Sequence, residues 1–167
     1  IRDDGDGLAR AASQALDGAQ LAPADIGMVV AHGNGTPQSD ISEAAALRRA
    51  FGAAPPPTTA FKWALGHTIA AAGILETALA LEALARGTVP GVANLARLAA
   101  ACAGVPVSAG AQKPRHRHRV AQALFGDAGV QVLPLRPVAH DRQLPAGKPA
   151  SQSGPRVQEF LVPLPAA

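Results

Sequence analysis

The sequence predicts an α/β fold in which helices pack against a mixed sheet. Apolar residues at helical spacing alternate along the chain with short, continuous apolar runs. One run, at residues 26–31 (IGMVVA), is typical of a parallel strand that is buried on both faces. Two later runs, at 120–124 and 129–135, flank the turn FGDAG and predict an antiparallel hairpin. Parallel and antiparallel strands joined by helices indicate a layered α/β architecture.

Two helices are predicted in the first third of the chain. The first covers residues 6–16, with Asp6 able to cap its start. The second follows the turn HGNGTP and runs from Asp40 to about Phe51. Asp40 is placed to cap this helix, and Glu43 occupies the matching position of a capping box. The turn itself is rich in residues that accept unusual backbone angles.

A longer helix is predicted at residues 67–86, after the linker AAPPP and a short β-prone segment at 58–61. Small residues fill its first turns, at 68–73, and small side chains let another backbone approach closely. We therefore expect the start of this helix to pack deep inside the molecule. Gly87 follows in the position where glycine ends many helices.

Patterns are weaker in the rest of the chain. Residues 89–90 and 105–108 are short strand candidates, and Cys102 between them has the surroundings of a buried packing residue. The basic run KPRHRHR at 113–119 is either a solvated loop or a docking site for an acidic partner.

Length and composition fit one ordinary domain followed by a tail. The chain has 167 residues, enough for a sizeable core. Pro, Gly, Ser and Gln dominate near the end, so we divide the chain into a domain at 1–135 and a Pro/Gly-rich tail or linker at 136–167. Only 16% of the residues are charged, which indicates that another domain or subunit covers part of the surface.

Composition also excludes several classes of function. The formal charge of +3 and the 3% aromatic content argue against nucleic-acid binding. Residues 68–85 include Glu76 and Glu82, and a carboxylate near the bilayer centre costs about 2–3 kcal/mol or more, so no membrane span is expected. Cys102 is alone, which excludes an internal disulfide and a Cys-based metal site. We expect a cytoplasmic protein without a signal peptide, since cysteine is scarce and the first residues are polar and charged.

Two histidines stand in Gly-flanked turns that lead from a predicted strand toward a helix. His32 follows the first strand, His67 follows the second, and Lys62 precedes His67. Two imidazoles in such turns can donate hydrogen bonds to a developing enolate or oxyanion. Lys62 adds positive potential that favours anionic substrates such as carboxylates. Loop histidines often serve structure alone, so the residues by themselves leave catalytic and structural roles both open.

Competing chemistries find less support. His32, His67 and Asp40 match no common ligand spacing, so no metal site is predicted. The chain has no GxSxG motif, which argues against a serine hydrolase. Cys102 lies in AAACAGV, without residues that would activate a thiol. No nucleophile of the expected kind therefore accompanies the two histidines.

Both histidine turns resemble motifs of the β-ketoacyl synthases, the thiolase-fold condensing enzymes of fatty acid and polyketide synthesis. AHGNGTPQSDISEA, at 31–44, is similar to the family's HGTGTxxGDxxEA, and FKWALGHTIAAAG, at 61–73, to its KxxxGHxxxAAG. LFGDAG falls where the family has a terminal SFGFGG turn. The resemblance covers approximately residues 5–135. It implies a thiolase-like C-terminal half, with a mixed five-stranded sheet packed against helices.

By this resemblance, His32 and His67 match the two catalytic histidines, and Lys62 matches the lysine beside them. Glu43 and Glu76 match acidic positions that support the site, and Glu76 in an apolar helix needs a partner in any case. The family reaction is a decarboxylative Claisen condensation. A cysteine thiolate takes an acyl group from a carrier protein, malonyl–carrier protein loses carbon dioxide, and the resulting carbanion attacks the acyl thioester.

Four further positions concern the substrate. Thr36 matches a threonine that contacts the pantetheine arm, and Asn34 replaces a second threonine there. Phe125 fits the terminal turn, whereas Asp127 replaces a phenylalanine that gates the acyl pocket. The resemblance implies no bound cofactor, because the substrates arrive on the phosphopantetheine arm of acyl carrier protein.

The resemblance is to a C-terminal half alone, and the family's nucleophilic cysteine lies upstream of it. We therefore expect the chain to complete a β-ketoacyl synthase with an N-terminal half or a partner subunit, as a homo- or heterodimer, and to be inactive alone. The alternative is a non-catalytic, chain-length-factor-like partner, or a truncated remnant that binds a partner subunit or carrier protein. A degradative thiolase is disfavoured, because that class needs a second cysteine near the C-terminus.

Overall fold

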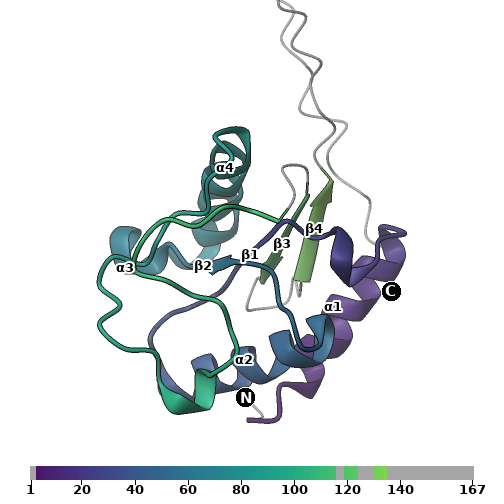
Figure 1. Cartoon of the computed structure of the whole chain (residues 1–167), viewed down its shortest axis with the longest axis horizontal. Helices are drawn as coiled ribbons and strands as arrows, with labels where there is room; N and C mark the ends of the chain where they lie inside the picture. The colour runs from purple at the N-terminus through teal and green to yellow at the C-terminus, as the bar shows by residue number, and fades with distance from the viewer. Residues whose placement is uncertain (1–2, 116–118, 124–129, 135–167) are drawn as a thin grey trace, which may run out of the picture. The chain divides into compact units, whose positions relative to one another are not determined.

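A computed structural model of the chain describes residues 3–115, 119–123 and 130–134 (Figure 1). Helices and strands alternate as expected over most of this length. In chain order they are α1 (Asp6–Gly18), β1 (Met28–Val30), α2 (Pro37–Phe51), β2 (Thr58–Thr59), α3 (Lys62–Leu65), α4 (Ala72–Ala85), β3 (Arg119–Ala123) and β4 (Val130–Pro134). Short 3₁₀ turns lie at Pro23–Asp25, Ile69–Ala71 and Ala100–Cys102. The predicted tail at 136–167 lies outside the described residues.

The strands form one mixed sheet, which confirms the predicted fold class. Their order is β2-β1-β3-β4, with β1 parallel to both of its neighbours and β3 antiparallel to β4. The predicted hairpin is therefore confirmed. Among the described residues the sheet has four strands, and a fifth is reduced to one parallel bridge between Thr58 and Val107.

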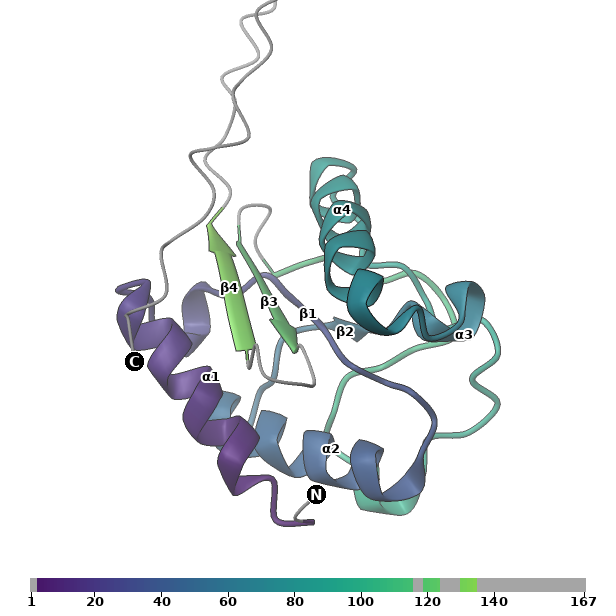
Figure 2. The same cartoon turned by 180° about the vertical axis from the view of Figure 1, so that it is seen from behind.

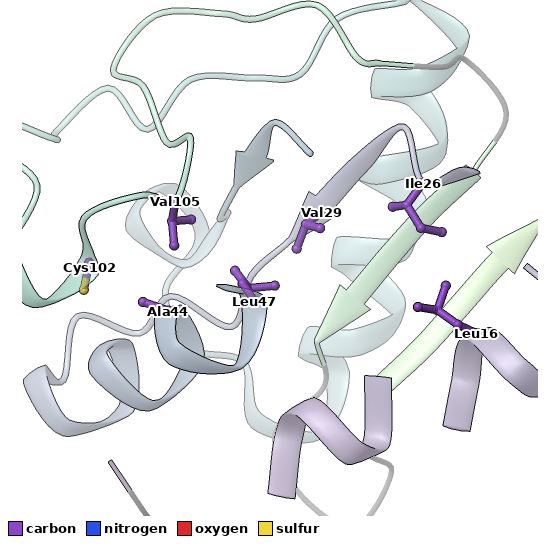
Figure 3. Close-up of a cluster of buried hydrophobic side chains, with 7 residues drawn as sticks. All are labelled: Leu16, Ile26, Val29, Ala44, Leu47, Cys102 and Val105. Atoms are coloured by element: carbon purple, nitrogen blue, oxygen red, sulfur yellow. The ribbon is translucent and has the colours of Figure 1, made fainter. Parts of the chain in front are cut away.

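Strand β1 is buried on both faces, as its continuous apolar run predicted. Val29 points into a core with α1 and α2, whereas Met28 and Val30 point into a second core with α4, because successive side chains of a strand alternate. Figure 2 shows α1 and α2 on one side of the sheet and α4 on the other. Figure 3 shows the first core, which consists of Leu16, Ile26, Val29, Ala44, Leu47, Cys102 and Val105.

The starts of the first two helices differ from the prediction. Gly5, with φ +65°, occupies the N-cap of α1, and Asp6 makes no side-chain cap there. A Cβ on Gly5 would lie 2.3 Å from the Ser42 carbonyl oxygen, so glycine lets α1 begin directly against α2. Helix α2 begins at Pro37. Proline is favoured at the first position of a helix, because an N–H there would have no partner within the helix. The prediction that Asp40 caps α2 is therefore wrong, since Asp40 lies inside its first turn.

One continuous helix was predicted over 67–86, and this is wrong at its start. The helix α4 begins only at Ala72, after the short helix α3, a Gly66 turn with φ +73° and a 3₁₀ turn. Ile69 in that turn has φ +50°, which is unfavourable for a β-branched residue and interrupts the helical path. The predicted end is confirmed. Gly87 has φ +64°, and the Thr88 amide donates to the Ala83 carbonyl, as in a Schellman motif.

A band of large apolar side chains is exposed on α3, the 3₁₀ turn and α4. The expectation that this region packs deep inside is wrong for the described chain, in which Ile69 is 80% and Ile74 70% exposed. We call this band the apolar stripe; it consists of Trp63, Leu65, Ile69, Ile74, Leu75 and Leu79. Contiguous apolar surface of this kind marks interaction sites. None of the helices described here is long and apolar enough to cross a membrane.

The apolar stripe predicts that the isolated chain self-associates and binds an apolar dye. Ile74→Glu should reduce both several-fold and leave the urea unfolding midpoint nearly unchanged, because the side chain is 70% exposed. Ala85→Glu adds the same charge to an exposed position of the same helix outside the stripe, and should change neither. Sedimentation velocity and dye fluorescence measure these effects. A monomeric wild-type chain without dye binding would contradict the interpretation.

Candidate active site

The two histidine turns meet because their strands are neighbours. Strands β1 and β2 are parallel, so their carboxyl ends lie at the same edge of the sheet, where α/β folds place their ligands. His32 follows β1, while Lys62 and His67 follow β2. The two imidazole rings lie edge to face, with centroids 5.1 Å apart and planes at 76°. The structure thus brings together the three residues that the sequence singled out.

Glu43 of α2 holds the His32 turn in place. Its Oε1 accepts the His32 amide at 2.7 Å, and its Oε2 accepts the Gly33 amide at 3.1 Å. The predicted capping-box role of Glu43 is therefore wrong, because its carboxyl accepts amides of the His32 turn and not the N-cap amide of its own helix. Gly33 has φ +47°, and a Cβ there would lie 2.5 Å from the Ala60 Cβ. Only glycine lets this turn lie so close to the end of β2.

Lys62 and Glu76 form a buried ion pair at the site. The Lys62 Nζ lies 2.5 Å from the Glu76 Oε1, and the two side chains are 5% and 3% exposed. The expectation that Glu76 needs a partner is confirmed. This pair ties the first turn of α3 to the middle of α4, so it fixes the turn that carries His67. It also balances a cation and a carboxylate that would each be costly to bury alone.

His67 is exposed and uses one ring nitrogen within its own turn. Its Nδ1 accepts the backbone N–H of Ile69 at 3.1 Å. In the neutral ring the proton therefore sits on Nε2, since a nitrogen that accepts an N–H cannot carry one. The left-handed backbone of Ile69 brings that amide into place. The result is a hydrogen-bond donor at Nε2.

Burial shifts the pKa of His32 and the pKa of Glu43, whose carboxyl holds the His32 turn. Burial, with help from the charges of Lys62 and His67, lowers the pKa of His32 from 6.5 to about 4. His32 is therefore neutral at physiological pH. Burial raises the pKa of Glu43 from 4.5 to about 7, although the amides of His32 and Gly33 favour its charged form. The Glu43 carboxyl thus ionises near neutral pH.

The predicted substrate contacts are only partly described. Asn34 uses its Oδ1 to accept the Thr36 amide at 2.9 Å, so it stabilises the turn itself. Thr36 is exposed at the N-cap of α2 and makes no side-chain cap. Phe125 and Asp127 lie outside the described residues.

A cavity of about 840 Å³ adjoins these residues. Lys62, His67 and Glu43 are among the residues that line it, together with residues of the loop 92–98. Sequence reasoning missed this loop, because its residues have no periodicity and no recognisable motif. Cys102 also lines the cavity, but it is buried, and burial raises the pKa of its thiol. No cluster of three or more His, Cys, Asp or Glu suited to a metal exists in the part of the chain that is described.

The basic run is only partly within the described residues, since 116–118 lie outside them. Arg115 donates to the carbonyls of Ala54 and Pro55, at 2.7 and 3.2 Å. These bonds hold the linker before β2, so Arg115 has a structural role whatever else the run does.

The arrangement suits the stabilisation of negative charge that develops on an oxygen. His67 offers an N–H donor, and His32 stands beside it as a neutral imidazole. Donors fixed in advance in this way typically contribute several kcal/mol to a transition state. Lys62 adds no uncompensated charge, because Glu76 neutralises it.

Comparison with known proteins identifies the family. The family described as "Beta-ketoacyl synthase, C-terminal domain" matches residues 1–96. The chain belongs to the β-ketoacyl synthase family. It is 34% identical to 3-oxoacyl-(acyl-carrier-protein) synthase 2 of Mycobacterium bovis over 129 residues, which are 77% of this chain and 31% of that protein.

Solved ketosynthases share the fold. The ishigamide ketosynthase/chain length factor matches with a TM-score of 0.67 and 33% identity, over 77% of this chain and 32% of that one. A type II ketosynthase in complex with its acyl-carrier protein, bound to the hexaketide, matches with a TM-score of 0.71 and 25% identity, over 79% and 33%. The thiolase-like fold is thereby confirmed. The chain spans about a third of the length of these proteins.

Removing one member of the buried ion pair should destabilise the chain strongly, and removing both members should restore most of the stability. Lys62→Met removes the cation beside the buried Glu76 carboxylate and should cost about 3–5 kcal/mol of unfolding free energy. The double variant Lys62→Met/Glu76→Leu should recover most of that loss, since neither charge remains. Urea unfolding of both variants measures the difference. A single variant that costs under about 1 kcal/mol would show that the pair is solvated.

Opposite pKa shifts predict a distinctive pH dependence. The lowered pKa of His32 contributes stability that is present above pH 6.5 and is lost as the pH falls to about 4. The raised pKa of Glu43 contributes stability that is present below pH 4.5 and is lost as the pH rises through about 7. Glu43→Gln removes the second contribution and should lose stability overall. Its deficit relative to wild type should shrink as the pH rises from about 4.5 to 7, as measured by unfolding in urea. A deficit that is constant over this range would contradict the shift.

Proposed function

We propose that this chain supplies the histidine–lysine half of the active site of a β-ketoacyl synthase. The observation that carries the proposal is the edge-to-face contact of His32 and His67, whose ring centroids are 5.1 Å apart, at a site that also holds the buried pair of Lys62 and Glu76. Two imidazoles side by side at the carboxyl edge of a sheet suit the stabilisation of an enolate. The reaction would be the decarboxylative Claisen condensation of malonyl–carrier protein with an acyl thioester.

In this reaction the carboxylate–carbon bond of the malonyl group breaks and releases carbon dioxide. The electron pair passes into the thioester carbonyl, whose oxygen becomes an enolate that accepts hydrogen bonds from His67 and His32. The enolate carbon then attacks an acyl group on a cysteine, and that thiolate leaves. The chain offers no activated cysteine at this edge, so the nucleophile would come from an N-terminal half or a partner subunit.

The proposed substrates arrive on the phosphopantetheine arm of acyl carrier protein. Thr36 is exposed beside the His32 turn and can meet the arm, while Asn34 shapes the turn from within. One of the similar structures is a ketosynthase in complex with its acyl-carrier protein, which supports a carrier protein as partner. The apolar stripe supports a second polypeptide partner, because it flanks His67. We propose a homo- or heterodimer for the complete enzyme.

A second candidate is a non-catalytic, chain-length-factor-like subunit. It draws support from the similarity to a ketosynthase/chain length factor and from the missing nucleophile. The buried Lys62–Glu76 pair and the paired histidines argue against it, since a scaffold needs neither. The coding sequence upstream discriminates the two. A cysteine in a small-residue turn there favours the enzyme, whereas glutamine or serine favours the partner.

Carbon dioxide release tests the proposal directly. With the N-terminal half supplied, the chain should decarboxylate malonyl–carrier protein, and His67→Ala should slow release about 100- to 1,000-fold, as expected for the loss of an oxyanion donor. Thr68→Ala, at the exposed neighbouring position, should leave the rate within about twofold of wild type. Unchanged release by His67→Ala would refute the assigned role.

A further inference from the structure

The turn that carries His32 contains a chemically labile pair, Asn34 followed by Gly35. Asparagine is among the thermolabile residues of proteins. It deamidates when the backbone nitrogen of the next residue attacks its side-chain amide, and glycine in that next position leaves the nitrogen unhindered. Asn34 and Gly35 are both exposed, and a Cβ added at Gly35 would meet no atom within 4 Å. Water can therefore reach this peptide bond, and the backbone around it has room to rearrange.

The folded turn holds the side-chain amide of Asn34 against the peptide bond that follows it. The Asn34 Oδ1 accepts the backbone N–H of Thr36 at 2.9 Å. This hydrogen bond closes a ring that contains the peptide bond between Asn34 and Gly35, so the amide stays folded over that bond. The same N–H can stabilise the negative charge that develops on Oδ1 when the amide is attacked, as a donor in an oxyanion hole does.

The nitrogen that would make the attack lies beside a carboxyl group. The Gly35 amide donates a hydrogen bond to the carboxyl of Asp40 and favours its charged form. A carboxylate in this position can accept the amide proton as the new bond forms. One short segment thus supplies the nucleophile, an acceptor for its proton and a donor for the developing oxyanion.

We propose that Asn34 and Gly35 form a site of spontaneous deamidation, which the fold of this turn promotes. The Gly35 nitrogen bonds to the Asn34 Cγ, the bond from Cγ to Nδ2 breaks, and ammonia leaves with the proton of the Gly35 amide. The product is a cyclic succinimide. Water then opens the ring at either carbonyl and gives aspartate or isoaspartate at position 34.

Either product changes the candidate active site. Asn34 lines the same cavity as Lys62 and His67, so a carboxylate at this position adds negative charge to the cavity. Isoaspartate also adds a methylene group to the main chain of the turn that Glu43 holds. In a synthase the added charge would repel the malonyl carboxylate and slow the release of carbon dioxide, and this consequence rests on the proposed function.

Mass spectrometry of the full chain, kept at physiological temperature and neutral pH, tests the inference without catalysis. Trypsin releases the two asparagines of the chain, Asn34 and Asn94, in separate peptides. Asn94 is the internal control, because it is also exposed and lines the same cavity but is followed by Leu95. The Asn34 peptide should lose ammonia and gain water at least about tenfold faster than the Asn94 peptide, since Asn34 has an unhindered nitrogen beside it and a fixed donor on its amide.

Two variants at Thr36 separate the effect of the folded turn from that of the dipeptide. Thr36→Pro deletes the N–H that binds the Asn34 Oδ1, and the backbone at this position, with φ −83° and ψ 119°, is close to that of proline. It should slow deamidation about tenfold, less than the loss of a donor in a buried active site costs, because the turn is exposed. Thr36→Val keeps the N–H and removes only the hydroxyl, so Asn34 should deamidate as fast as in wild type. Urea unfolding checks that both variants are folded.

The outcomes separate this inference from the proposed function. Equal rates for Asn34 and Asn94 in wild type, or a folded Thr36→Pro variant that deamidates as fast as wild type, would overturn the inference. Rapid deamidation in a complete enzyme that releases no carbon dioxide would refute the proposed condensation and leave the modification site standing. Undiminished release by a fully deamidated chain would overturn the predicted effect on the active site.

Discussion

Parallel pairing of β1 with β2, in the register that sets Val30 beside Thr59, determines where the chemistry of this chain can lie. Because the strands run in the same direction, the turns that follow them leave the sheet at one edge. His32 comes from one turn, and Lys62 and His67 come from the other. Gly33 lets the two turns touch, since any side chain there would collide with Ala60. The site is thus a consequence of strand direction and of one missing Cβ.

The ionisable groups buried at this site are compensated by opposite charges and by hydrogen bonds. The charge of Lys62 is neutralised by Glu76, and both carboxyl oxygens of Glu43 accept hydrogen bonds from amides of the His32 turn. Each acidic residue comes from a helix that covers a different face of the sheet, α4 for Glu76 and α2 for Glu43. Both helices therefore hold the same edge. His32 is left neutral between them, which suits hydrogen bonding to a developing anion better than permanent charge would.

The sequence predicted this group of residues well because the information was local. A buried strand followed by a Gly-flanked histidine can be recognised within about a dozen residues, and so can the Lys62–His67 segment. The capping role assigned to Glu43 was wrong because two amides of the His32 turn bind its carboxyl in place of the start of α2. The prediction that a helix begins at His67 was wrong because the left-handed backbone of Ile69 interrupts it. Isoleucine disfavours a left-handed backbone, so the sequence did not indicate this interruption.

The cavity could not be predicted from the sequence, because its lining residues come from α2, from the segment after β2 and from the segment 92–107, which are far apart in the chain. The exposure of the apolar stripe was equally hidden. Small residues at 68–73 indicated close packing, but they could not show whether the packing partner lies within this chain. The described residues leave Ile69 and Ile74 exposed, so no packing partner for these two side chains lies among them.

The central claim is that a neutral His32 and the imidazole of His67, held in fixed orientations, meet at this edge. NMR of the ring nitrogens in a chain labelled with ¹⁵N-histidine tests it most directly. The variants His32→Gln and His67→Gln assign the signals to the two rings. The account predicts that His32 stays neutral as the pH is lowered to about 4, that His67 in its neutral form carries its proton on Nε2, and that the two rings show a mutual contact. A His32 that becomes protonated near pH 6.5, or a neutral His67 with its proton on Nδ1, would contradict the account.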